Sequence, residues 1–139
     1  MTTIKQVAAE CARKQDCTCV IVDGPPGIGC PVIASLTGVD VAVIVTEPTL
    51  AGIHDMERVA GVARHFSIPI KVVINKYDIN QENSEAIVAI CQKENMEVVA
   101  HIPFSQEVVE SMVHGVPVVE FSQDRVTQEI IALWKKLNH

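Results

Sequence analysis

Residues 19–29 read CVIVDGPPGIG. The first four residues form a continuous apolar run, which is typical of a strand buried on both faces, and Asp23 ends it. The remaining residues include three glycines and two prolines and therefore predict a sharp turn. A short helix is expected to begin at Cys30, because Pro31 suits the first turn of a helix. The stretch predicts the strand, loop and helix of an α/β protein.

The same alternation of strands and helices continues along the rest of the chain. The further expected strands are residues 41–45, 70–74 and 98–102, the expected helices are residues 3–15, 50–66, 83–94, 105–113 and 123–137, and residues 118–119 are expected to be extended. Continuous apolar strands separated by helices favour a parallel sheet that is covered on both faces. The prediction is a single three-layer α/β/α domain over residues 1–139, with a mostly parallel sheet.

Length and composition exclude several classes of protein. A chain of 139 residues with 48% hydrophobic residues is long enough for one compact domain and too short for two. The 11 basic residues are scattered among 17 acidic ones, so we expect no nucleic-acid partner. No apolar run approaches the roughly 18 residues of a membrane span. Residues 1–5 lack the apolar region of a signal peptide, so a cytoplasmic protein is expected.

Four loops follow the expected strands, and they predict one binding site. In open parallel sheets, ligands bind outside the carboxyl ends of the strands. The loops are residues 23–29, 46–49, 75–78 and 103–106. Each of them carries polar residues, glycine or proline at the strand exit, so we expect them to surround the same ligand.

Asp23 lies where a carboxylate could hold Mg²⁺, either directly or through water. The backbone N–H groups of the turn after it could approach a phosphate, since glycines permit that close approach. The alternative is a carboxylate that only caps a sharp turn. Residues 24–31 also have the glycine spacing of the phosphate-binding motif G-x-x-x-x-G-K-[ST]. Cys30 and Pro31 replace its lysine and hydroxyl residues, so we reject that motif here.

Residues 75–78, with the sequence NKYD, match the N-K-x-D motif with which GTPases read guanine. In that reading, the Asp78 carboxylate accepts hydrogen bonds from N1–H and the exocyclic amine of the base. The alternative is a polar loop with an asparagine turn.

The cysteines do not predict a disulfide framework or a metal site. Their number is odd, their spacing is uneven, and no C-x₂-C pair occurs. Cys17 and Cys19 would face the same side of a strand, which leaves redox or metal binding together with Cys30 as an alternative. The simpler interpretation of Cys17 and Cys19 is two small buried thiols.

Several of these segments resemble the MinD/Mrp/ParA group of P-loop ATPases, also called CobQ/CobB/MinD/ParA nucleotide-binding proteins. Residues 23–35 resemble their switch II segment, and residues 46–49, 54–58 and 73–80 match further parts of the group. The likeness is to MinD-type ATPases with an inserted ferredoxin domain, and it extends from about residue 17 to the C-terminus.

The resemblance implies a P-loop NTPase-like, Rossmann-like fold that binds ATP and Mg²⁺. By this resemblance, Asp23 ends the Walker B strand near Mg²⁺, with water between them, and Gly27 belongs to the catalytic switch turn that senses the γ-phosphate. Asn75 would contact adenine, and Pro103 and Phe104 would line the base pocket.

The same resemblance makes guanine recognition through Asp78 the second choice. In this group, the N-K-x-D-like motif accompanies ATP. A GTPase switch would also show D-x-x-G, whereas Pro26 fills the glycine position of this chain. A GTPase-like fragment remains an alternative.

The chain departs from the group in one large respect. It contains no K-G-G-x-G-K-[ST] motif, no switch I and no cysteine-rich cluster motif, so it resembles the C-terminal half of such an ATPase, without the N-terminal P-loop unit. We therefore expect no iron–sulfur cluster and no ATP hydrolysis by the chain alone. An uncovered sheet edge would accept a P-loop-bearing half or a second copy as a dimer. A non-catalytic interaction module is the alternative, and intact Asp23 and Asn75 count against it.

Overall fold

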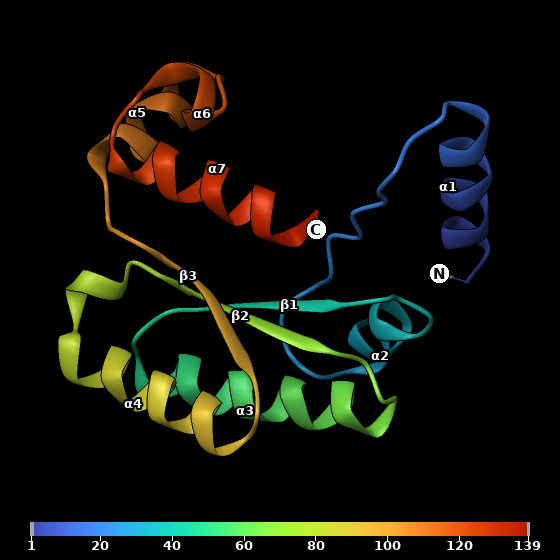
Figure 1. Cartoon of the computed structure of the whole chain (residues 1–139), viewed down its shortest axis with the longest axis horizontal. Helices are drawn as coiled ribbons and strands as arrows, with labels where there is room; N and C mark the ends of the chain where they lie inside the picture. The colour runs from blue at the N-terminus through green and yellow to red at the C-terminus, as the bar shows by residue number, and fades with distance from the viewer. Residues whose placement is uncertain (1, 139) are drawn as a thin grey trace.

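The computed structural model describes residues 2–138, which are arranged around a three-stranded parallel sheet (Figure 1). The strands β1 (Ala42–Thr46), β2 (Ile70–Asn75) and β3 (Glu97–Ile102) lie side by side in that order. Val73 pairs with Ala100 whereas Val72 pairs with Val98, so β3 has a bulge at Val99. The sheet is parallel, as predicted, because a crossover helix returns the chain to the same end before each new strand.

Helices lie on both faces of this sheet (Figure 1). Helices α3 (Leu50–His65) and α4 (Gln81–Lys93) form one layer, and α7 (Arg125–Leu137) packs on the opposite face against β3. The remaining helical elements are α1 (Thr2–Lys14), α2 (Cys30–Leu36), the short 3₁₀ helix η1 (Tyr77–Ile79), α5 (Gln106–Val113) and α6 (Val118–Phe121). The predicted three-layer α/β/α architecture is confirmed.

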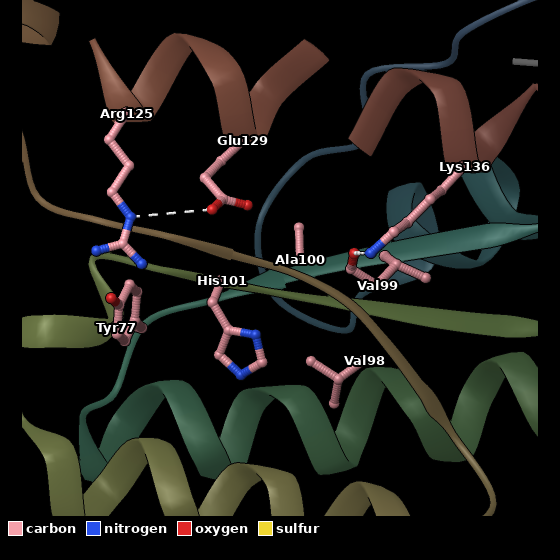
Figure 2. A pocket seen from close by; sticks show the side chains of 8 residues that line it. All are labelled: Tyr77, Val98, Val99, Ala100, His101, Arg125, Glu129 and Lys136. Carbon is pink, nitrogen blue, oxygen red and sulfur yellow. Dashed lines mark hydrogen bonds and ion pairs between the residues drawn. The ribbon is translucent and has the colours of Figure 1, made fainter. Parts of the chain in front are cut away.

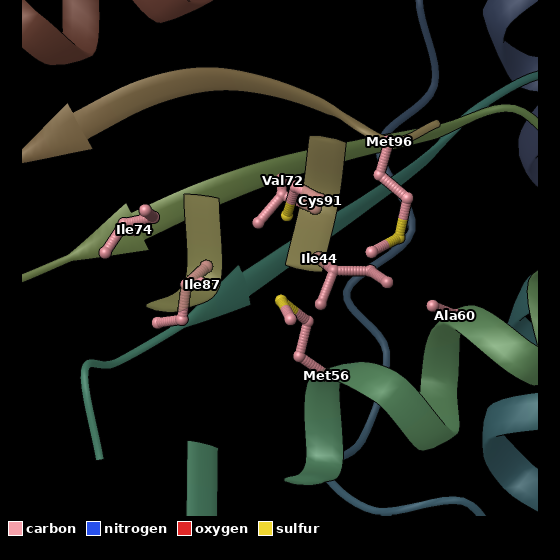
Figure 3. Close-up of a cluster of buried hydrophobic side chains, with 8 residues drawn as sticks. All are labelled: Ile44, Met56, Ala60, Val72, Ile74, Ile87, Cys91 and Met96. Atoms are coloured by element: carbon pink, nitrogen blue, oxygen red, sulfur yellow. The ribbon is translucent and has the colours of Figure 1, made fainter. Parts of the chain in front are cut away.

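The core lies on both sides of β2, because successive strand residues face opposite layers. Toward α3 and α4, one buried cluster consists of Ile44, Met56, Ala60, Val72, Ile74, Ile87, Cys91 and Met96 (Figure 3). Toward α7, a second cluster consists of Val73, Val99, Ala100, Ile102 and Val126. Burial within the first cluster raises the pKa of the Cys91 thiol. These clusters fix the strand ends from which the loops of the predicted site emerge.

The strand predicted at residues 19–22 is wrong. Within the described part of the chain, residues 18–28 make no backbone hydrogen bond, and Ile21 is 76% exposed. A strand forms only when a neighbour accepts its backbone hydrogen bonds, and β1 pairs with β2 alone. Residues 19–22 therefore have the composition of a buried strand, but no strand in the described part of the chain pairs with them.

The extended piece predicted at residues 118–119 is also wrong, because these residues begin α6. Pro117 precedes the helix, and its carbonyl accepts hydrogen bonds from the backbone N–H groups of Glu120 and Phe121. The Thr127 hydroxyl donates to the Val118 carbonyl at 3.1 Å, which ties the short helix to α7. Contacts distant in sequence thus outweigh the strand preference of valine.

The Lys5 side chain of helix α1 contacts the C-terminal end of α2. The Lys5 ammonium donates to the backbone carbonyls of Ser35 and Thr37, and burial lowers the pKa of Lys5.

In the part of the chain that the structure describes, no helix combines the length and apolar character needed to cross a membrane.

Candidate functional site

Three of the four predicted loops come together at the carboxyl edge of the sheet. They are residues 46–49, 75–78 and 103–106, which follow β1, β2 and β3. Each loop leads to a helix with a side-chain cap: Thr49 accepts from the Gly52 N–H, Asn80 from the Asn83 N–H, and Ser105 from the Glu107 N–H. The positive ends of three helices therefore lie at this edge, and they favour an anionic ligand.

Hydrogen bonds and an ion pair join these loops to one another. The Lys76 Nζ lies 2.7 Å from the Glu47 Oε1, which links the loops after β1 and β2. The Phe104 N–H donates to the Asp78 Oδ1 at 2.7 Å, which links the loops after β2 and β3. The Asn83 Nδ2 donates to the Pro48 carbonyl at 3.0 Å. The loops therefore form one connected surface.

A left-handed turn at Lys76 directs the chain from β2 into η1. Its φ of 53° is uncommon for a residue other than glycine, and it reverses the chain within one residue. The Ser84 hydroxyl of α4 then donates to the Tyr77 carbonyl at 2.6 Å. This turn is consequently held at both ends, by Glu47 through Lys76 and by α4.

The first turn of α3 approaches the loop after β1 unusually closely. A Cβ atom added to Gly52 would lie 2.4 Å from the Glu47 carbonyl oxygen, so only glycine fits there. The Thr46 hydroxyl also donates to the Gly52 carbonyl at 2.9 Å. Gly52 thus allows α3 to hold Glu47 in place.

Asn75, Pro103 and Phe104 lie at the ends of two neighbouring strands, and their role in a base pocket stays a prediction. Asn75 ends β2 opposite Ile102, and Pro103 and Phe104 follow that residue directly. Within residues 2–138, the Asn75 amide has no hydrogen-bond partner, so its donor and its acceptor are both available. Phe104 is 52% exposed, and it follows by two residues Ile102, the strand partner of Asn75.

Asp78 lies in the same cluster, but the structure gives its carboxylate a partner that the sequence did not suggest. Its Oδ1 accepts from the Phe104 N–H, whereas the guanine interpretation requires the carboxylate to face a base. Asn83 and Ser84 were missed as well. The three capping residues had a recognisable pattern, because serine, threonine or asparagine precedes each helix.

Asp23 and Gly27 are on the exposed segment between α1 and α2. Among the described residues, this segment makes no hydrogen bond or ion pair with the three joined loops, and Asp23 has no side-chain partner. Gly27 has a φ of 92°, a conformation that glycine adopts without strain. The roles of Asp23 and Gly27 stay predictions.

The cysteines of this segment are exposed, so the interpretation of Cys17 and Cys19 as buried thiols is wrong. Without a paired strand at residues 19–22, no second layer covers them. Within residues 2–138, no group of three or more histidine, cysteine and acidic side chains is arranged to hold a metal ion.

A separate cavity of about 330 Å³ lies at the free edge of β3 (Figure 2). It is lined by Tyr77, Val98, Val99, Ala100, His101, Arg125, Glu129 and Lys136. The Lys136 Nζ donates to the Val99 carbonyl at 2.8 Å, and the Arg125 guanidinium lies 5.9 Å from the centre of the Tyr77 ring. A lysine at the edge of a sheet hinders the addition of another strand, so this edge is protected.

Comparisons with known proteins give a consistent result. The family model described as ParA, NUBPL iron-transfer P-loop NTPase, matches residues 1–137. An uncharacterized protein of Methanocaldococcus jannaschii is 29% identical over 126 residues, which are 91% of this chain and 42% of that protein.

Two solved structures share the fold. The MinD cell division protein of Aquifex aeolicus superposes with a TM-score of 0.80 at 25% identity, covering 95% of this chain and 58% of that one. The septum site-determining protein MinD of Pyrococcus horikoshii, complexed with Mg-ADP, gives 0.69 at 20% identity, covering 83% of this chain and 48% of that one. The chain thus spans about half of the solved chains, and less of the curated relative.

Proposed function

Because the chain belongs to the ParA family of P-loop NTPases, we propose that it forms the base-binding and switch part of an ATP site, whose phosphate-binding loop comes from outside these 139 residues. The observations that carry the proposal are the Asn75 amide, which has no partner among the described residues, and the exposed Phe104, which follow neighbouring strands at the carboxyl edge of a parallel sheet. The cytoplasmic location expected from the sequence stays a prediction.

Asn75 and Phe104 have the chemistry that adenine recognition needs. A side-chain amide carries a donor and an acceptor, which match the exocyclic amine and a ring nitrogen of adenine. The Phe104 ring would stack on the flat face of the base, and Pro103 beside it would exclude water. In this proposal, the base lies over the ends of β2 and β3.

Asp23 would hold Mg²⁺, and Gly27 would face the γ-phosphate. Mg²⁺ commonly keeps several waters and binds one or two carboxylates together with phosphates, so a single unpaired carboxylate fits it. The ion would supply neutralisation of charge on the phosphates. The left-handed turn at Gly27 lets backbone N–H groups come close to an anion.

The open edge of β1 is where we propose that the P-loop-bearing portion adds a strand. The Ala42 N–H donates to the Pro69 carbonyl of the neighbouring strand region. Because backbone N–H and C=O groups alternate in direction along a strand, those of Val43 and Val45 point away from β2. Val43 and Val45 also expose their side chains, as does Ile21 on the unpaired segment. A second copy of the chain could use the same edge.

Titration with labelled ATP, with and without Mg²⁺, tests the proposal. The chain alone is expected to bind weakly, and addition of a segment carrying K-G-G-x-G-K-[ST], sought in the neighbouring coding sequence, should tighten binding at least tenfold in a Mg²⁺-dependent way. Phe104→Ala should weaken binding about tenfold through lost stacking. If neither mixture binds ATP, the proposal is wrong, and the non-catalytic interaction module becomes the better interpretation.

We expect Val45→Lys to abolish association through the β1 edge without unfolding the chain. Val45 is 63% exposed, so a lysine fits there, but its charge would be buried by an added strand. Sedimentation velocity should show concentration-dependent dimers for the natural chain and monomers for Val45→Lys. The matched control is Val109→Lys on α5, where valine is 46% exposed. The same sedimentation for all three proteins would contradict the use of this edge.

A further inference from the structure

The geometry points to Asp78 as a positioning residue of the ATP site: its carboxylate holds the Phe104 loop beside Asn75, and it does not read a guanine base. This inference rests on the proposed function and deepens it, because it assigns the nucleotide selectivity of the site. Asp78 itself would not touch the nucleotide.

The bond between Asp78 and Phe104 joins the ends of two neighbouring strands. The Phe104 N–H donates to the Asp78 Oδ1 at 2.7 Å, which is short for this type of hydrogen bond and typical of an ionised acceptor. Ile102 before Phe104 is buried, and Ser105 after it caps α5. The Asp78 carboxylate therefore fixes the backbone of Phe104, which lies between buried Ile102 and the helix cap Ser105.

Asp78 can position Phe104 because its own turn is rigid. The Ile79 N–H donates to the Lys76 carbonyl, and the Ser84 hydroxyl donates to the Tyr77 carbonyl at 2.6 Å. Asn80 then caps α4. The backbone on both sides of Asp78 is consequently held in place by β2 and α4. Through its hydrogen bond, the Asp78 carboxylate also holds the backbone of the loop that follows β3.

The same bond opposes guanine recognition. Guanine presents N1–H and an exocyclic amine side by side, so a carboxylate must offer both oxygens in a bidentate arrangement. One oxygen of Asp78 already accepts a short hydrogen bond from the Phe104 N–H. A turn of the carboxylate away from the Phe104 N–H would release the loop that carries the stacking ring. The Asn75 amide has no partner among the described residues, so it is free to meet the base, and its donor and acceptor accommodate adenine.

Hydrogen–deuterium exchange of the Phe104 amide, followed by NMR on the 139-residue chain, tests the positioning role without nucleotide. Asp78→Ala should accelerate this exchange about 10- to 100-fold, the range for loss of a hydrogen bond to a charged group. Asp78→Asn keeps a carbonyl acceptor and should restore most of the protection. Asp40→Ala, which removes an exposed carboxylate that has no partner among the described residues, is the matched control. Exchange in Asp78→Ala within about twofold of the natural chain would overturn the inference.

Competition among ATP, GTP and xanthosine triphosphate, with the P-loop-bearing segment present, tests the selectivity. ATP binding should weaken about tenfold in Asp78→Ala and recover in Asp78→Asn. If Asp78 instead read guanine, the natural chain would prefer GTP, and Asp78→Asn would prefer xanthosine triphosphate, whose 2-oxo group accepts from an amide. That preference would overturn the inference. A natural chain that binds no nucleotide would contradict the proposed function, whereas the exchange experiment decides the role of Asp78 separately.

Discussion

The 139-residue chain by itself is expected to release phosphate from ATP no faster than a protein-free control does. Catalysis of phosphoryl transfer depends on positioning and on stabilisation of charge, which a P-loop supplies through its lysine and backbone amides. The cationic side chain of the three joined loops is Lys76, and its Nζ is already paired with Glu47 at 2.7 Å. We expect a rate at least about 10³-fold below that of the chain completed by a P-loop-bearing segment.

Phosphate release measured with and without that segment checks this expectation. Asp23→Asn serves as the control, because it removes the carboxylate proposed to hold Mg²⁺ from an exposed position and leaves the core untouched. Turnover that persists in Asp23→Asn comes from a contaminating ATPase. Turnover by the isolated chain that Asp23→Asn abolishes would show that these residues suffice for hydrolysis, and the expectation would then be wrong.

Ile74→Ala is expected to cost about 2–5 kcal/mol of unfolding free energy. Ile74 is 0% exposed on the central strand β2, where it packs in the cluster between the sheet and the layer of α3 and α4 (Figure 3). Truncation would leave a cavity that strands on both sides prevent from collapsing. Since small domains are stable by only about 5–15 kcal/mol, this loss is a large share of the total.

Urea denaturation followed by circular dichroism measures this effect. Ile74→Val removes one methylene group and should cost about 0.5–1.5 kcal/mol. Ile131→Ala on α7, where the side chain is 43% exposed, should change the free energy by about 0.5 kcal/mol or less. Equal losses for Ile74→Ala and Ile131→Ala would mean that the cluster around Ile74 does not carry the stability of the fold.

The strands that sequence patterns predicted correctly are those with partners in the chain. Residues 41–45, 70–74 and 98–102 are mostly apolar, with Lys71 and His101 as the exceptions, and each run lies within one residue of an observed strand. Residues 19–22 have the same pattern, yet they are exposed and unpaired. An apolar run indicates that a segment must be buried. It does not indicate which strand will pair with that segment, because this depends on the whole sheet.

The candidate site was predictable where it depends on strand ends and unpredictable where it depends on contacts between loops. Asn75 and Phe104 follow neighbouring strands, so the rule for parallel sheets brought them together. The pairing of Lys76 with Glu47, and of Asp78 with the Phe104 N–H, joins residues distant in sequence. No spacing rule encodes such contacts, and the N-K-x-D pattern even suggested a different partner for Asp78.

The two edges of the sheet differ, and we expect this difference to limit how far the sheet can grow by strand pairing. At β3, the bulge at Val99 and the Lys136 side chain on its carbonyl discourage pairing, whereas β1 carries no such protection. A sheet with two receptive edges can grow without end into filaments. A sheet with one receptive edge accepts a single addition, so we expect growth of this sheet by strand pairing to end after one strand-bearing partner has joined β1.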